Sequence, residues 1–149
     1  NQAKERFEKL PFARLDLTPF KADMKETFGD EKWQKLSQGC LGCGACTFVC
    51  PTCQCFDIRD FKAKDGVIRF RCWDSCMYSD FTQMAGGNPR TTQMQRFRQR
   101  FMHKLVYYPK RYGGTYSCVG CGRCVEKCPQ HLNIVKVIKE FANDGKEGE

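Results

Sequence analysis

The clearest periodic pattern of apolar residues lies between residues 92 and 108, in the segment TQMQRFRQRFMHKLVYY. Its large apolar side chains recur every three to four residues, at Met94, Phe97, Phe101 and Leu105. This spacing places them on one face of an α-helix and leaves the arginines elsewhere. Thr91 or Thr92 is expected to cap the amino end of the helix, and Pro109 is expected to stop it.

Two further segments show a helical pattern. In LNIVKVIKEFAN, near the carboxyl end, apolar residues recur at helical spacing, at Leu132, Val135, Ile138 and Phe141. In GDEKWQKLSQG, residues 29–39, acidic residues occupy the first turn and Trp33 and Leu36 share one face, which predicts a short helix. The residues before this helix show no clean period, so we expect extended chain that lies on a surface and is a candidate docking segment.

The segment CFDIRDFKAKDGVIRFRCW, residues 55–73, predicts a β-hairpin. Apolar residues flank a turn-prone KAKDG stretch, at Phe56, Ile58, Val67, Ile68 and Phe70. A five-residue loop at KAKDG puts Phe56 opposite Cys72. Cys55 and Cys72 are then expected side by side at the open end of the hairpin.

Cysteine carries the strongest chemical signal in this chain. Twelve of the 149 residues are cysteine, and eight of them fall in two copies of one phrase, CLGCGACTFVCP at 40–51 and CVGCGRCVEKCP at 118–129. Disulfide-rich secreted domains scatter their cysteines to join distant loops. Two tight runs instead gather sulfurs around a small volume, which suits a metal or a cluster. Thiolate ligands also indicate a reducing compartment, so we expect the protein in the cytoplasm.

The C-x2-C-x2-C-x3-C-P run is the ligand pattern of two-cluster ferredoxins, in which the fourth cysteine binds the other cluster. The predicted ligands of the first [4Fe–4S] cluster are Cys40, Cys43, Cys46 and Cys128. The predicted ligands of the second are Cys118, Cys121, Cys124 and Cys50. Each copy of the phrase thus completes the site of the other, and the 67 residues between Cys50 and Cys118 are expected to loop out.

The remaining residues shared by the two copies fit this interpretation. Glycines that permit positive φ and bring backbone N–H groups close to cluster sulfur are Gly42, Gly44, Gly120 and Gly122. Pro51 and Pro129 redirect the chain after the crossing cysteine. The alternative is a pair of zinc sites, but zinc usually takes two C-x2-C pairs per site, whereas a triple followed by C-P is ferredoxin-like.

Four cysteines lie outside the two runs. They are Cys53, Cys55, Cys72 and Cys76. The predicted hairpin brings both pairs together, so that four thiolates are available for a third centre. Three interpretations stay open for them: a third iron–sulfur cluster, a structural zinc ion, or free thiols in a partly buried environment.

The net charge of +8 is concentrated between the two runs. Residues 62–112 hold eleven Lys and Arg against three acidic residues, while the rest of the chain is balanced. A basic block of this kind suggests nucleic-acid binding, because the aromatic residues interleaved with its arginines could stack on bases. A four-thiolate cube carries roughly −2, however, so two cubes offset about half of the excess.

Several stretches together resemble a known family. CLGCGACTFVCPTCQCFD, WDSC, NPR, RFRQRFMHK and CVGCGRCVEKCP are similar to the dicluster domain in the A subunit of anaerobic sulfite reductase and to the β subunits of soluble sulfhydrogenases. The resemblance covers roughly residues 30–140. It implies the eight cysteines of the runs as cluster ligands, and electron transfer from a flavin-containing subunit to a catalytic or hydrogenase subunit, or the reverse. Proteins of this family are longer at the amino end, so the chain is expected to be a fragment or a shortened subunit.

We therefore predict a mainly α protein, an α-helical-ferredoxin-like dicluster domain with a small β-hairpin insertion. Its expected parts are a leader over 1–39, the dicluster domain over 40–142 with an insertion at 53–112, and a polar tail over 143–149. A compact βαβ ferredoxin is disfavoured because 67 residues separate the runs. No apolar run reaches the length of a transmembrane helix.

The predicted function is electron transfer within an oxidoreductase complex, by a subunit that is not itself catalytic. Its two histidines, His103 and His131, stand in no recognisable catalytic arrangement, and there is no nucleotide-binding glycine loop. Two alternatives are a nucleic-acid-binding iron–sulfur protein and an enzyme whose third metal site performs chemistry directly. The first is disfavoured because the aromatic residues of the basic block fall on one helical face.

Overall fold

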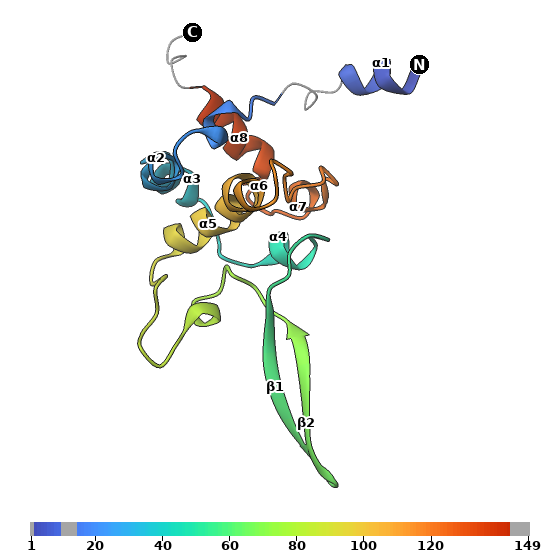
Figure 1. Ribbon diagram of the computed structural model, residues 1–149, viewed down its shortest axis with the longest axis vertical. Helices are drawn as coiled ribbons and strands as arrows, with labels where there is room; N and C mark the ends of the chain where they lie inside the picture. The colour runs from blue at the N-terminus through green and yellow to red at the C-terminus, as the bar shows by residue number, and fades with distance from the viewer. Residues whose placement is uncertain (1, 10–14, 144–149) are drawn as a thin grey trace.

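The computed structural model describes residues 2–9 and 15–143, which form short helices and a two-stranded antiparallel sheet (Figure 1). Its helices and helical turns are α1 Gln2–Glu8, the 3₁₀ turn η1 Thr18–Lys21, α2 Met24–Gly29, α3 Lys32–Ser37, α4 Ala45–Phe48, the 3₁₀ turn η2 Asp80–Thr82, α5 Gln93–Met102, the π-helical turn η3 His103–Tyr107, α6 Tyr108–Arg111, α7 Arg123–Glu126 and α8 Ile134–Ala142. The strands are β1 Phe56–Ala63 and β2 Gly66–Trp73. Beyond Asn143, the expected polar tail lies outside the described residues, as do residues 1 and 10–14 of the expected leader.

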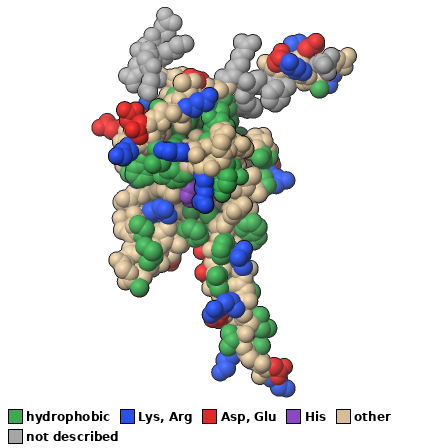
Figure 2. Space-filling model, viewed as in Figure 1, with side chains coloured by type: hydrophobic (Ala, Val, Ile, Leu, Met, Phe, Trp, Pro, Cys, Tyr) green, Lys and Arg blue, Asp and Glu red, His purple; other side chains and the backbone are tan. Residues whose placement is uncertain are grey.

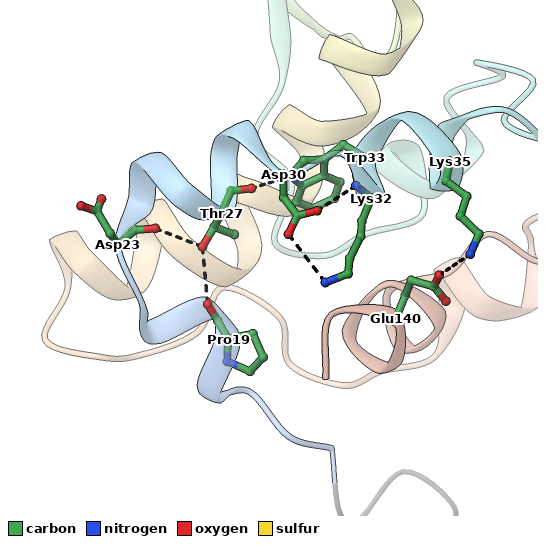
Figure 3. Close-up of polar contacts among 8 residues, drawn as sticks. All are labelled: Pro19, Asp23, Thr27, Asp30, Lys32, Trp33, Lys35 and Glu140. Carbon is green, nitrogen blue, oxygen red and sulfur yellow. Dashed lines mark hydrogen bonds and ion pairs between the residues drawn. The ribbon is translucent and has the colours of Figure 1, made fainter. Parts of the chain in front are cut away.

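The core lies where α3, α5 and α8 meet. Trp33 of α3 is its centre, with its ring 6.3 Å from that of Phe101 on α5 and 4.7 Å from that of Phe141 on α8, centroid to centroid. The indole N–H donates to the carbonyl of Thr27 at 2.6 Å, so the buried polar edge of the ring is satisfied (Figure 3). Contacts of this size between large aromatic rings dominate the stability of a small core.

Residues 18–29 form two helical segments where an extended leader was expected. Asp23 accepts a hydrogen bond from the Lys25 N–H at 2.7 Å and so caps α2. Thr27 on α2 donates to the carbonyls of Asp23 and Pro19, which ties η1 to α2 (Figure 3). Phe20 of η1 is then buried in the core. Residues 18–37 are therefore part of the helical body.

The predicted helix at the basic segment is confirmed, with Thr92 as its cap. The Gln95 N–H donates to the Thr92 hydroxyl at 3.3 Å, and the Thr92 N–H donates to the Gln95 side chain at 3.0 Å. This reciprocal pair satisfies two N–H groups that a helix start otherwise leaves without partners. Phe97 and Phe101 are buried on the core face.

The expected stop at Pro109 is wrong, because the helical path continues through η3 into α6. Within η3 the hydrogen bonds reach five residues back, so the Tyr108 N–H donates to the carbonyl of His103. Pro109 has no N–H to give to the next carbonyl, that of Lys104. The Ser117 N–H donates to this carbonyl instead, at 3.3 Å. The hydrogen bond from Ser117 to Lys104 thus joins η3 to the residue just before the second cysteine run.

The β1–β2 hairpin extends away from the helical body and carries basic and apolar side chains along its length (Figures 1 and 2). Ala63 pairs with Gly66, so a two-residue turn replaces the expected five-residue loop. This moves the register by one residue and places Cys72 opposite Asp57 instead of Phe56. The expected hairpin is confirmed, but its expected register is wrong.

Candidate iron–sulfur sites

One small pocket in the helical body is lined by cysteines from both runs. They are Cys40, Cys43, Cys46 and Cys128. Backbone N–H groups point at two of the sulfurs: Leu132 donates to Cys128 Sγ at 3.2 Å, and Gly42 donates to Cys40 Sγ at 3.5 Å. Such donors stabilise negative charge on sulfur. The last cysteine of the second run thus lies with the first three of the first run.

The two runs fold in the same way. Gly44, at φ 72°, precedes α4, and Gly122, at φ 76°, precedes α7. Their surroundings differ, since a Cβ on Gly44 would lie 2.9 Å from Ser75 Oγ and 3.0 Å from Tyr78 Oη, while a Cβ on Gly122 would meet nothing within 4 Å. The Tyr78 hydroxyl also donates to the carbonyl of Cys43 at 3.2 Å. The segment after the hairpin therefore supports the first run.

Cys50, the last cysteine of the first run, is held next to the start of the second. Its sulfur lies 3.3 Å from the Thr52 hydroxyl, which donates to the carbonyl of Ser117 at 2.6 Å. The helical turns of the two runs, α4 and α7, are in contact. Cys118 and Cys124 pack against the core cluster, whereas Cys121 is exposed.

The surroundings of two thiols in the first run shift their pKa values in opposite directions. Burial raises the pKa of Cys46, because a thiolate loses its hydration there. Hydrogen bonds, the strongest of them from the Cys53 thiol and another from the Thr52 backbone N–H, lower the pKa of Cys50 to about 4. The charge of Arg100 acts against the effect of burial at Cys46.

Two buried cations lie among the cysteines. Arg100 is 4% exposed and lines both the Cys40/43/46/128 pocket and a neighbouring cavity, and its Nε has no hydrogen-bond partner. Burial alone lowers the pKa of Arg100, but the nearby sulfurs of Cys46, Cys124 and Cys53 outweigh it and hold the pKa above its ordinary value. Lys104, one turn further along, is 5% exposed, and its Nζ donates to the hydroxyl groups of Thr52 and Ser117.

The sequence pattern alone did not identify these two cations. The pattern placed the arginines away from the apolar face, where side chains are expected to be exposed to solvent. The structure instead buries Arg100 and Lys104 between the cysteine groups. The four-residue spacing between Arg100 and Lys104 puts both on one side of the helix, and this spacing could have indicated a shared environment.

The arrangement fits anionic clusters. Buried charges in proteins are paired or bound to metal centres. In the described part of the chain, neither Arg100 nor Lys104 forms an ion pair with a carboxylate. A four-thiolate cube with a charge of roughly −2 would supply this counter-charge. The cysteine thiols, the pocket that they line and the unpartnered Nε of Arg100 therefore all fit an anionic iron–sulfur cluster.

The four remaining cysteines are only partly brought together. Cys53, Cys55 and Cys76 line an open cavity of about 470 Å³ beside Arg100, and the Cys76 thiol donates to Cys55. Cys72 lies on β2 instead, where its thiol donates to the Asp57 carbonyl at 3.8 Å. Within residues 2–9 and 15–143, no three His, Cys, Asp or Glu side chains are arranged to hold a single metal ion.

The histidines lie at the edges of these groups. His103 is exposed at the surface and shares a 2.9 Å hydrogen bond with the Gln99 side chain, and partial desolvation of its ring, with the nearby charges of Arg90 and Lys104, lowers its pKa. The His131 N–H donates to the carbonyl of Cys128 at 3.1 Å, and its φ of 52° turns the chain after the second run. Both are thus engaged in holding backbone and side chains in place.

Comparison with known proteins gives relatives for most of the chain. It is 42% identical over 115 residues to the beta subunit of sulfhydrogenase 2 from Pyrococcus furiosus, covering 76% of this chain and 34% of that protein. It is 29% identical over 89 residues to the B subunit of the fumarate reductase (CoM/CoB) from Methanothermobacter marburgensis, covering 52% of this chain and 16% of that protein. The chain therefore spans about a third of the length of the first relative and less of the second.

No solved structure matches the chain. Among the described helices, none has both the length and the apolar character needed to cross a bilayer. The family model of the 4Fe–4S dicluster domain matches residues 39–132, which include all twelve cysteines. This chain belongs to the 4Fe–4S dicluster domain family.

Proposed function

We propose that this chain is an electron-transfer subunit of a multi-subunit oxidoreductase and relays electrons through two [4Fe–4S] clusters between its flavin-containing and catalytic subunits. The position of Cys128 in one pocket with three cysteines of the first run is the observation that supports this most directly. The relatives point the same way, since both are named as subunits of oxidoreductases.

The proposed ligands follow the crossed scheme. The first cluster takes Cys40, Cys43, Cys46 and Cys128, and the second takes Cys118, Cys121, Cys124 and Cys50. A bound cube supplies one-electron chemistry in which no bond is broken. The protein's part is to hold the thiolates, to place amides and cations around them, and to keep water out. The proposed fold is an α-helical-ferredoxin-like dicluster body over 40–142, with the insertion 53–112 contributing α5 to the core and residues 18–37 packed into the same core. We also propose that the protein is cytoplasmic and has no nucleic-acid partner.

A relay needs one surface where electrons enter and another where they leave. The two runs offer exposed residues at matching positions for these surfaces. Cys43 and Cys121 are the exposed cysteines of the runs. Leu41 and Val119 occupy matching positions in the two copies and are 63% and 64% exposed. Partner subunits that cover these apolar side chains would reach the edge of each cluster. The proposed relay therefore has one contact surface at each run.

A third centre is a narrower proposal. Cys53, Cys55 and Cys76 are its candidate ligands, as an iron–sulfur cluster or a zinc ion, and Cys72 lies apart from them on the hairpin. Iron, acid-labile sulfide and zinc per chain, measured after anaerobic purification, separate the accounts. About eight irons without zinc leaves these thiols free, about eight with zinc gives a zinc site, and more than eight gives a third cluster.

Paired cysteine substitutions test the crossed relay. Cys128→Ala is expected to leave about four of about eight irons per chain, and so is Cys43→Ala. Because both residues serve one cluster, the double variant should lose no further iron. Cys128→Ala combined with Cys121→Ala should lose both clusters.

Iron content and the EPR spectrum of the dithionite-reduced chain provide the readout. A Cys121→Ala/Cys128→Ala double variant that kept half of the iron would show that each run closes on itself. The crossed scheme, and the relay built on it, would then fail.

A further inference from the structure

Arg100 is placed where a single cation can act on more than one cysteine group. Its side chain lines the Cys40/43/46/128 pocket on one side and the cavity that holds Cys53 on the other. It also lies close to Cys124 of the second run. The long helix that carries Arg100 thus passes between the two runs, although it belongs to neither.

Lys104 extends the same side of the helix toward the second site. Its Nζ donates to the Thr52 hydroxyl at 2.6 Å and to the Ser117 hydroxyl at 3.4 Å. These two residues lie next to Cys50 and Cys118 in space or in sequence. Lys104 is therefore nearest to the cluster that Cys50 completes, and Arg100 stands between both clusters.

We propose that Arg100 and Lys104 are positioning residues that set the reduction potentials of the two clusters, Arg100 acting on both and Lys104 mainly on the one that Cys50 completes. This rests on the proposed function, since it requires clusters at these cysteines. An electron taken up at either site adds one unit of negative charge and breaks no bond. A cation buried beside the site stabilises that added charge, and the surrounding protein screens it far less than water would.

A purely structural role is the competing explanation, because the Arg100 guanidinium also lies 4.4 Å from the Phe101 ring centroid. The two explanations differ in what they change. Lost packing lowers stability and leaves the potentials alone, whereas lost charge shifts the potentials even when the clusters are fully loaded. Reduction potential is therefore the decisive readout.

The test uses the full chain, loaded with clusters, in a redox titration with mediators followed by EPR. Arg100→Gln is expected to lower the equilibrium constant for one-electron reduction of both clusters at least tenfold, a shift of at least about 59 mV to more negative potential. Arg100→Lys keeps the charge and should stay within about threefold of the wild type. Lys104→Gln should shift the second cluster more than the first.

Arg98→Gln is the matched control, because it removes the same charge from the same helix. The Arg98 guanidinium lies 3.5 Å from the Phe28 ring centroid and donates to the Phe28 carbonyl at 3.0 Å, away from the cysteines. Its potentials should equal those of the wild type. An equal shift in Arg98→Gln and Arg100→Gln would overturn the proposal. Reduction equilibrium constants in Arg100→Gln that stay within about threefold of the wild-type values would also overturn it.

The fallback variant covers loss of iron in Arg100→Gln. In that case Lys104→Gln decides: a larger shift at the cluster that Cys50 completes supports the proposal, while unchanged potentials or a larger shift at the other cluster refute it. The proposed function fails separately, through a wild-type chain that binds no clusters.

Discussion

Replacing Gly44 or Gly122 by alanine tests whether the two runs are equivalent. The two glycines occupy the same position in the repeated phrase and share a left-handed backbone, at φ 72° and 76°. An added methyl group at Gly122 meets open space, whereas at Gly44 it would lie 2.9 Å from Ser75 Oγ and 3.0 Å from Tyr78 Oη. The pair therefore separates backbone strain from steric conflict.

The expected magnitudes follow from these surroundings. A left-handed alanine costs about 1–2 kcal/mol, and the stiffer unfolded chain returns about 0.4–1 kcal/mol, so Gly122→Ala should cost about 1 kcal/mol. At Gly44 the methyl group must also displace Ser75, which is fully buried and shares a 2.8 Å hydrogen bond with the Thr47 hydroxyl. A buried polar group left without its partner costs about 1–3 kcal/mol more.

Thermal unfolding under anaerobic conditions is the assay, with all variants compared at equal iron content so that cluster loss does not enter the comparison. A difference of about 1–3 kcal/mol corresponds to roughly 3–9 °C between the two variants in a chain of this size. Gly44→Ala should also load the first site less fully, because Tyr78 supports the carbonyl of Cys43. Equal melting temperatures for the two variants would refute the account of Ser75 and Tyr78 as a rigid support.

Three other predictions concern single sites. Cys76→Ala should remove any metal bound in addition to the two clusters, while Cys72→Ala should leave the metal inventory unchanged; the reverse result would place the hairpin cysteine in the third site. Thr52→Val removes the hydroxyl that links the two runs and should cost about 2–3 kcal/mol by thermal unfolding, since a buried charged donor loses its closest partner. Phe101→Ala should cost about 3–5 kcal/mol by the same measurement, because its ring is fully buried, whereas Phe61→Ala on the exposed hairpin should stay within about 0.5 kcal/mol.

Features set by neighbouring residues were predictable from the sequence. Thr92 caps its helix as expected because the cap and its partner are three residues apart, and the spacing of Phe97 and Phe101 places both in the core. The hairpin register was not predictable, because apolar residues fall on both exposed faces and so favour no single alignment. The path through Pro109 depends on an acceptor satisfied from Ser117, which no local pattern reveals.

The basic segment between the two runs is more than a passive connection. Arg96 donates to the backbone carbonyls of Met77 and Arg90, at 3.1 and 3.0 Å. Arg98 stacks over an aromatic ring, and Arg100 and Lys104 are buried beside the cysteines. Nucleic-acid binding needs such charges on the surface, where they can reach phosphates. On this helix they instead hold the fold together, and Arg100 and Lys104 face the sites where anionic clusters are proposed. This part of the charge excess therefore has an internal use that favours the electron-transfer interpretation.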